Sequence, residues 1–254
     1  MATPYYQDEH IMLYHGDMRE VLPELGQFDA CITDPPYGET SLAWDRWPDG
    51  WPALVADHTS SLWCFGSLRM FTTHWHEFTG WKLAQDIVWE KHTGSGFAAD
   101  RFRRVHEHAL HLYRGNWRDL HHDTPHIPYH GPDSRHGYSG AKRGGDDQHT
   151  GLIGEGHNWV DDGTRLARSV IHARSMWRRG AIHPTEKPAA ILDPLIRYSV
   201  PVGGLVLDPF AGSGSTLLTA RSLGRRAIGI EAREDYCEAA AKRLSIPDLL
   251  TQGA

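Results

Sequence analysis

The stretch Leu205-Val206-Leu207-Asp208-Pro209-Phe210-Ala211-Gly212-Ser213-Gly214-Ser215-Thr216 passes from an apolar run through two closely spaced glycines into a helical pattern. Residues 205–207 predict a short buried strand, and residues 216–223 predict a helix. Glycine lets the backbone turn tightly and come close to a ligand. A strand, a Gly-x-Gly turn and a helix in this order are typical of a nucleotide-binding site.

An acidic residue ends the next predicted strand. Residues 226–230 form an apolar run before Glu231, which lies 17 positions beyond Gly214, and a last helix is predicted over about 233–244. This spacing matches the acidic residue that binds ribose hydroxyls in dinucleotide folds. The pyrophosphate-binding turn has a third glycine where this chain has Leu217, and no P-loop lysine follows. A ribose-bearing ligand without a pyrophosphate fits better, and S-adenosylmethionine is such a ligand.

A second distinctive segment, Asp34-Pro35-Pro36-Tyr37, follows the apolar run 28–33. Two prolines neither continue a strand nor open a regular helical turn, so a stiff, extended loop is predicted. In open α/β sheets, ligands bind at the carboxyl ends of strands. A carboxylate and a carbonyl there can accept both N–H bonds of an amino group, while the Tyr37 ring stacks on a flat base. Taken alone, the tetrapeptide equally fits a turn with a capping aspartate.

Predicted strands and helices alternate through most of the chain. This order predicts an α/β fold with a doubly wound, mainly parallel sheet covered on both faces. The loop 38–50, which contains Trp44 and Trp47, is expected beside the site, either as a mobile lid or as a plain surface loop. The remaining strands are predicted at 10–15, 61–65, 86–91 and 107–113, and the remaining helices at 17–25, 52–60, 67–78 and 189–199.

Three segments together resemble the amino-group DNA methyltransferases, which modify the exocyclic nitrogen of adenine or cytosine. The tetrapeptide 34–37 resembles their catalytic motif, 208–216 their methionine-binding loop, and 183–188 the segment that precedes this loop and lines the cofactor site. The order, with the tetrapeptide first and the cofactor loop last, matches the circularly permuted beta subgroup. The resemblance covers about residues 8–92 and 183–244.

The resemblance implies a Rossmann-like methyltransferase domain in two halves. The catalytic half is expected at 1–92 and the S-adenosylmethionine-binding half at 183–254, with a loop-rich target-recognition insert at 93–182 between them. Residues 91–179 hold 14 Lys and Arg against 10 Asp and Glu, whereas the rest of the chain holds 12 against 22. A locally basic segment suits contact with DNA phosphates, although a solvated surface of mixed charge is the alternative. Candidates for contacts to DNA are Arg135, Lys142, Arg143, Arg174 and Arg178.

The resemblance also implies roles for single residues. Bonds from a flipped base's amine to Asp34 and to the Pro35 carbonyl would localise the nitrogen lone pair, which attacks the sulfonium methyl directly. Asp17 is predicted to cap the helix that follows it, and the family's Gly-Asp lies beside the cofactor's adenine. The catalytic residues are expected to be Asp34, Pro35, Pro36 and Tyr37. The cofactor-binding residues are expected to be Asp17, His183, Thr185, Lys187, Asp208, Phe210, Ala211, Gly212, Ser213, Gly214, Ser215, Thr216 and Glu231.

Composition and cysteine content exclude several other classes. No apolar run approaches the roughly 20 residues that span a bilayer, and the N-terminus lacks the pattern of a signal peptide. Three widely spaced cysteines argue against a disulfide framework or a zinc site, and His106-Glu107-His108 lacks the H-E-x-x-H spacing, so no metal is expected. None of Cys31, Cys64 and Cys237 follows a proline, as the nucleophile of carbon-5 cytosine methyltransferases does. A cytoplasmic enzyme is expected, without membrane association.

The favoured hypothesis is therefore an S-adenosylmethionine-dependent methyltransferase that acts on double-stranded DNA at adenine N6. Asp heads the tetrapeptide more often in adenine members of the resembled family, and Ser in cytosine-N4 members. The alternatives are cytosine-N4 methylation, methylation of RNA or of a protein amide, and a nucleic-acid-binding module with a degenerate cofactor site. Members of the resembled group often dimerise, so a homodimer is expected.

Overall fold

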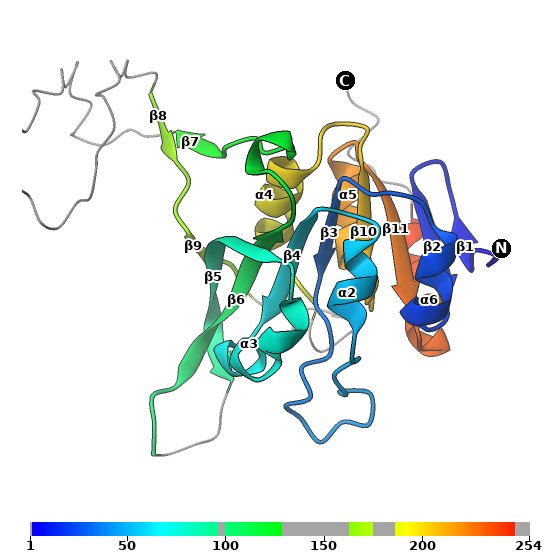
Figure 1. Ribbon diagram of the computed structural model, residues 1–254, viewed down its shortest axis with the longest axis horizontal. Coiled ribbons are helices and arrows are strands. Elements are labelled where there is room, and N and C mark those ends of the chain that lie inside the picture. The colour runs from blue at the N-terminus through cyan, green and yellow to red at the C-terminus, as the bar shows by residue number, and fades with distance from the viewer. Residues whose placement is uncertain (1, 96–99, 129–162, 175–185, 247–254) are drawn as a thin grey trace, which may run out of the picture. The chain divides into compact units, whose positions relative to one another are not determined.

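The computed structural model describes residues 2–95, 100–128, 163–174 and 186–246, and at 92–95 it describes the backbone alone. Contacts divide the chain into a large unit, formed by 1–123 and 169–254, and a small unit, formed by 124–168. Within its described residues, the large unit contains one sheet with the strand order β1-β2-β11-β10-β3-β4-β6-β5-β9 (Figure 1).

Five neighbouring strands in this sheet, β2, β11, β10, β3 and β4, run parallel to one another. The predicted mainly parallel α/β sheet is thus confirmed, and strands from both ends of the chain interleave in it. The strands are β1 (Tyr6–Gln7), β2 (Ile11–His15), β3 (Ala30–Thr33), β4 (Ser61–Gly66), β5 (Lys82–Ser95), β6 (Arg104–Tyr113), β9 (Val170–His172), β10 (Leu205–Asp208) and β11 (Arg226–Glu231).

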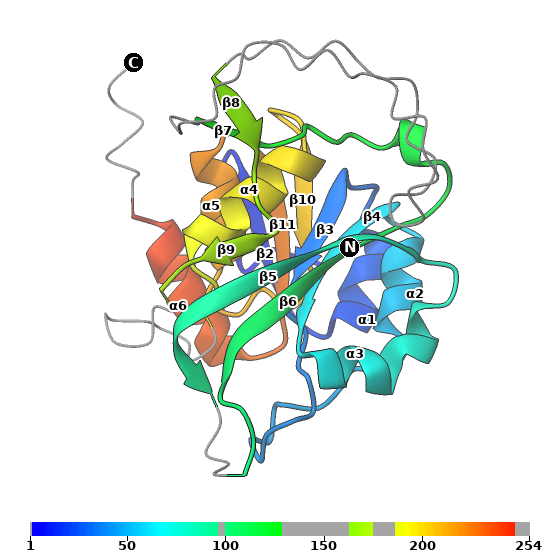
Figure 2. The ribbon, with the colours of Figure 1, turned by 90° about the vertical axis from the view of Figure 1, so that its left-hand side faces the viewer.

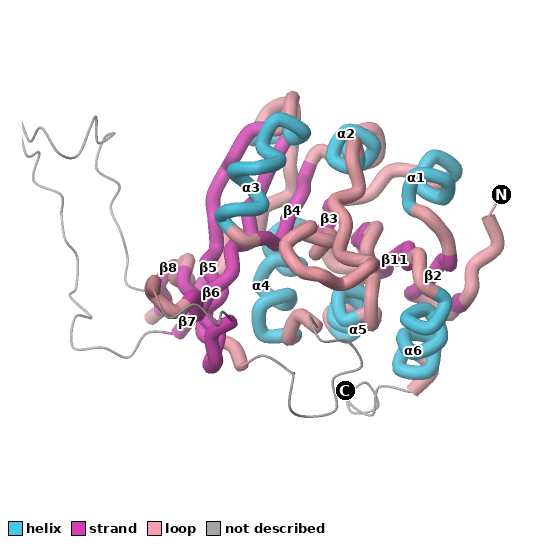
Figure 3. Tube along the Cα trace, turned by 90° about the horizontal axis from the view of Figure 1, so that it is seen from below, coloured by secondary structure: helices cyan, strands magenta, loops and turns pink. Residues whose placement is uncertain are grey.

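Helices cover both faces of the sheet, as Figure 3 shows. They are α1 (Met18–Val21), α2 (Trp51–Ala56), α3 (Leu68–His74), α4 (Ala189–Ser199), α5 (Ser215–Ser222) and α6 (Glu234–Leu244). Side chains alternate between the faces of a strand, so each buried strand serves two cores. In β3, Ala30 and Ile32 pack with the residues of α4, α5 and α6, whereas Cys31 packs with those of α1, α2 and α3.

Three predicted helices are shorter than expected. The helix predicted over 17–25 ends at Val21 and continues as a 3₁₀ turn, Leu22–Glu24. The helix predicted over 52–60 ends at Ala56, and the one predicted over 67–78 ends at His74 and continues as a 3₁₀ turn, Trp75–Phe78. The helix predicted over 189–199 has those same bounds. No helix among the described residues is long and apolar enough to cross a membrane.

Strands β5 and β6 form a long antiparallel hairpin at one side of the sheet, with β6 paired to β4 as well (Figure 2). Strand β9 pairs with β5 in parallel. Residues 104–113 and 170–172 were expected within the insert that begins at 93, but they belong to the sheet of the large unit. The loop-rich composition of the chain after His92 concealed the pairing of these two strands.

The small unit contains one described two-stranded ribbon, in which β7 (His126–Pro128) pairs antiparallel with β8 (Thr164–Leu166). Next to the ribbon, the Ala167 amide donates to the Pro125 carbonyl at 2.8 Å. Four of the candidate DNA-contacting residues, Arg135, Lys142, Arg143 and Arg178, lie outside the described residues.

The parallel strands bring several sequence motifs to one edge of the sheet. Asp34 follows β3, Asp208 ends β10 and Glu231 ends β11, and these three strands are neighbours. Because β6 is antiparallel to β4, the start of β6 lies at the same edge, which places Glu107 there. This is the edge at which doubly wound sheets bind ligands.

Candidate active site

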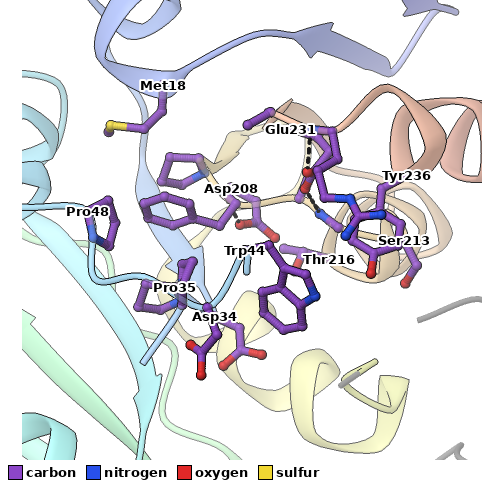
Figure 4. Close-up of a pocket in the computed structure, with 18 of the residues that line it drawn as sticks. Met18, Asp34, Pro35, Trp44, Pro48, Asp208, Ser213, Thr216, Glu231 and Tyr236 are labelled. Atoms are coloured by element: carbon purple, nitrogen blue, oxygen red, sulfur yellow. Dashed lines mark hydrogen bonds between the residues drawn. The ribbon is translucent and has the colours of Figure 1, made fainter. Parts of the chain in front are cut away.

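A cavity of about 370 Å³ lies at this edge and is lined by both halves of the large unit. Its size is in the range of ordinary ligand sites. The tetrapeptide 34–37 lines it from one side, and the segment 208–213 with Glu231 lines it from the other (Figure 4). The loop after the tetrapeptide contributes Trp44, whose indole points into the cavity (Figure 4).

The tetrapeptide holds its carboxylate by a bond within the motif. The Tyr37 hydroxyl donates to Asp34 Oδ1 at 2.6 Å. Burial is the main cause that raises the pKa of Tyr37 well above its usual value, and the nearby Asp34 charge adds to it. Tyr37 is therefore a neutral donor at physiological pH, and its ring is fixed beside the carboxylate.

A buried chain of alternating charges extends from this carboxylate. The ammonium of Lys187 pairs with Asp34 Oδ2 and lies 3.5 Å from Glu107 Oε2, while the Lys91 ammonium pairs with Glu107 Oε1. The side chains of Lys187 and Glu107 are 7% and 11% exposed. Burial alone would lower the pKa of Lys187, but the charges of Asp34 and Glu107 raise it above its usual value. Lys187 is thus a permanent cation inside the site.

Asp208 lies at the end of β10 in a different environment. The Thr33 hydroxyl donates to Asp208 Oδ1 at 2.7 Å, and the Phe210 amide donates to the same oxygen at 3.2 Å. Burial is the main cause that raises the pKa of Asp208 to about 6, and the charge of Asp34 adds to it. This carboxyl fixes the beginning of the glycine turn to the neighbouring strand.

The glycine turn has the backbone that its composition predicts. Gly212 and Gly214 have φ values of +50° and +74°, in the left-handed region that other residues rarely adopt. No atom lies within 4 Å of the place where a Cβ on Gly212 would be. The Gly212 amide donates to Glu231 Oε2 at 2.8 Å, and the Arg233 amide donates to Glu231 Oε1 at 2.9 Å. Glu231 is therefore oriented by two backbone bonds, and each oxygen retains a lone pair.

The loop 38–50 is held by Asp45, whose side chain is buried. Asp45 Oδ1 accepts from the Gly38 amide at 2.8 Å, and Oδ2 accepts from the Glu39 and Thr40 amides at 3.1 and 2.7 Å. Trp47 stacks on His74 with ring centroids 4.1 Å apart. A mobile lid and a plain surface loop were both expected as alternatives for this segment. These contacts favour a loop of defined conformation that forms a wall of the cavity.

The cavity fits S-adenosylmethionine on three grounds. The Gly212 backbone leaves open space for a ligand, and Glu231 presents carboxylate oxygens that suit ribose hydroxyls. Met18 and Phe210 add apolar surface for a flat ring. Asp17 also lines the cavity, where it caps α1 by accepting from the Arg19 amide at 2.9 Å, so its two expected roles are compatible.

Most expected site residues line this one cavity. Gly214 does not line it and instead caps α5, while His183 and Thr185 lie outside the described residues. Glu107 and Glu186 were not among the expected site residues, yet both line the cavity. Glu107 lies between two histidines in the sequence, and this pattern was considered as a possible metal site. In the structure, Glu107 instead pairs with two lysines. The expected residues that line the cavity are Asp17, Asp34, Pro35, Pro36, Tyr37, Lys187, Asp208, Phe210, Ala211, Gly212, Ser213, Ser215, Thr216 and Glu231.

The cysteines take no part in this site. All three are buried and free, and none lines the cavity. Burial raises the pKa of the Cys31 and Cys64 thiols well above the usual value, and that of Cys237 to about 12. Since a thiolate is the reactive form, these residues do not supply a nucleophile.

Comparison with known proteins identifies relatives along nearly the whole chain. The family model N6_N4_Mtase, described as DNA methylase, matches residues 28–242. The Type II methyltransferase M.ScaI of Streptomyces caespitosus is 29% identical, over 96% of this chain and 84% of that protein. The Type II methyltransferase M2.DpnII of Streptococcus pneumoniae is 26% identical, over 96% of this chain and 93% of that protein.

Solved structures share the fold. The M1.HpyAVI–SAM complex matches with a TM-score of 0.61 and 23% identity, over 92% of this chain and 99% of that chain. PvuII DNA methyltransferase, which is described as cytosine-N4-specific, matches with a TM-score of 0.65 and 16% identity, over 98% of this chain and 91% of that chain.

Proposed function

The chain belongs to the DNA methylase family, whose members transfer a methyl group from S-adenosylmethionine to an exocyclic amine of DNA, and we propose that its target is adenine N6 in duplex DNA. The observation that supports methyl transfer to an amine is the convergence of Asp34, the Gly212 turn and Glu231 on one cavity. A site for an amine and a site for a ribose-bearing cofactor thus lie side by side.

The residues of the cavity have complementary tasks in this proposal. Glu231 and the Gly212 turn would hold S-adenosylmethionine, whose sulfonium would supply the methyl group. Asp34 and the Pro35 carbonyl accept the two N–H bonds of the target amine and orient its lone pair. The nitrogen–carbon bond would form as the sulfur–carbon bond breaks and leaves a neutral thioether, and the Asp34 carboxylate and the Tyr37 ring face would stabilise the positive charge on the base until the amine loses a proton. The target base flips out of the duplex to reach them.

The choice of adenine rests on the Asp that heads the tetrapeptide, which is commoner in adenine members of the family. Cytosine N4 is the second candidate, because the same hydrogen bonds serve its amine. The same proposal includes four further expectations. They are the circularly permuted arrangement, a recognition role for the segment around the small unit, a homodimer and a cytoplasmic location. Light scattering of the purified protein tests the dimer.

The test incubates the protein with methyl-labelled S-adenosylmethionine and unmethylated plasmid DNA, and then identifies the labelled nucleoside after digestion. Label on N6-methyladenine that is lost in Asp34→Ala is the expected result. Label on N4-methylcytosine would overturn the choice of base and keep the mechanism. Label on RNA or protein alone, or cofactor binding without transfer to any substrate, would support the other two alternatives and overturn the proposal.

A further inference from the structure

The proposed mechanism asks Asp34 to accept a bond from the target amine, yet both of its oxygens already have partners. Tyr37 donates to Oδ1 at 2.6 Å, and the Lys187 ammonium pairs with Oδ2. A cation that stays on Oδ2 competes with the amine for this oxygen. It also opposes the positive charge that develops on the base, because like charges repel more strongly in a buried site.

The Lys187 ammonium has little freedom to move away. It lies 5.2 Å from the centroid of the Phe65 ring and 5.8 Å from that of Trp89, and its side chain is 7% exposed. Leaving the site would expose a buried carboxylate without its counterion, which is costly. The ammonium therefore needs a second anionic acceptor within the same pocket.

Glu107 supplies that acceptor. Its Oε2 atom is buried, has no hydrogen bond among the described residues and lies 3.5 Å from the Lys187 ammonium. Its other oxygen is bound by Lys91. The nearby charges of Lys187 and Lys91 outweigh burial and lower the pKa of Glu107, so Glu107 is an anion at physiological pH. Oε2 thus faces the Lys187 ammonium at ion-pair distance, and it is free to accept a closer hydrogen bond from it.

We propose that Glu107 is a positioning residue that draws Lys187 away from Asp34 when the target amine enters. Before the base arrives, the Lys187 ammonium pairs with Asp34 and holds its carboxylate in place. When the amine donates to Asp34 Oδ2, the ammonium donates to Glu107 Oε2 instead, a displacement that requires no water and no proton transfer. Lys91 keeps Glu107 in position throughout. This inference rests on the proposed function of Asp34.

The test is a double-mutant cycle with Glu107→Gln, Lys187→Met and the double variant. The rate of label transfer from S-adenosylmethionine to unmethylated plasmid DNA is measured in a single turnover with enzyme in excess. In E107Q the Lys187 ammonium remains on Asp34. We therefore expect the rate of methyl transfer to fall about 10- to 100-fold, which corresponds to the loss of one hydrogen bond to a charged group. The double variant is expected to match K187M within about threefold, because Glu107 acts through Lys187.

Three further measurements separate positioning from folding. Cofactor affinity by calorimetry is expected to stay close to wild type in E107Q. The melting temperature is expected to fall, because Lys91 and Lys187 lose a buried anionic partner, and far-UV circular dichroism at the assay temperature shows whether the variant is folded. Lys242→Met removes an exposed ion pair with Glu238 on α6 and serves as the matched control. An unchanged rate in E107Q, or losses that add in the double variant, would overturn the inference. Absence of transfer by the wild-type protein would instead overturn the proposed function, so the two failures are distinguishable.

Discussion

Asp34-Pro35 and Asp208-Pro209 are the same dipeptide at the carboxyl ends of two neighbouring parallel strands, β3 and β10. Asp34 lines the cavity with a side chain that is 20% exposed, and it pairs with an ammonium. Asp208 is 3% exposed, and it forms no ion pair in the part of the chain that the structure describes. Its partners are neutral donors, the Thr33 hydroxyl and the Phe210 amide.

This difference indicates that Asp34 can take part in the reaction, whereas Asp208 stabilises the fold. Asp34 lines the cavity and bonds to the Tyr37 hydroxyl and the Lys187 ammonium, so its oxygens lie where an amine can donate to them. Burial without a cation favours the neutral form of Asp208 and raises its pKa to about 6. Glu231, at the end of the adjacent strand β11, is intermediate, because burial raises its pKa while two backbone amides donate to it.

The largest effect is expected from Asp34→Asn. The amide keeps the size of the side chain but loses the charge that stabilises the transition state, so methyl transfer should fall about 10³-fold. Label transfer to plasmid DNA in a single turnover measures this loss. Asp193→Asn on α4 removes an exposed ion pair with Arg197 and should transfer methyl groups at the wild-type rate. Comparable rates of methyl transfer in D34N and D193N would show that Asp34 has no catalytic role, and Asp34 would then not differ from Asp208 in function.

Asp208→Asn is expected to change the pH dependence of stability. The folded protein holds the Asp208 proton more tightly than the unfolded chain does, so this stabilisation is complete below pH 3.8 and is lost as pH rises through about 6. Asn cannot ionise, so unfolding free energies of D208N relative to wild type should rise by up to about 3 kcal/mol from pH 4 to pH 7. Urea unfolding across this range measures the difference, and a flat difference would contradict it.

Glu231→Gln extends the comparison to the third strand. The amide can accept a bond through one atom only, so the bonds from the Gly212 and Arg233 amides can no longer both be made. We expect the dissociation constant for S-adenosylmethionine to rise about 10- to 100-fold, since hydrogen bonds to charged groups are lost. Calorimetry measures it, with the exposed Glu238→Gln as control. An unchanged affinity would place the ribose elsewhere.

The smallest effect is expected from Thr33→Val, which removes the hydroxyl that donates to Asp208 and keeps the shape of the side chain. The buried carboxyl loses its donor from β3, and the free energy of unfolding should fall by about 1–2 kcal/mol. The loss should be larger at pH 7 than at pH 4, because the charged form needs the donor more. Thr72→Val on the exposed side of α3 is the control, and equal losses in both variants would show that the bond to Asp208 is not the cause.

Much of the fold could be predicted because local patterns and tertiary structure agree. The apolar runs before Asp34, Asp208 and Glu231 are strands, and the residues after the two glycines form a helix. Residues 107–113 were predicted as a strand but were placed in the insert at 93–182, because the bounds of the insert came from the family resemblance. Only the pairing of β6 with β4 and β5 assigns this strand to the sheet.

By itself, the sequence determined the strand–helix order, the glycine turn and the positions of the carboxylates, because these depend on backbone conformation and on short-range apolar patterns. Only the tertiary structure decided which carboxylate has a cation. Lys187 lies 153 positions from Asp34, and Glu107 comes from a third segment. The partners of a buried group are set by what lies within a few ångströms in space. Two identical Asp-Pro dipeptides therefore differ, because Asp34 pairs with a cation whereas burial raises the pKa of Asp208 to about 6.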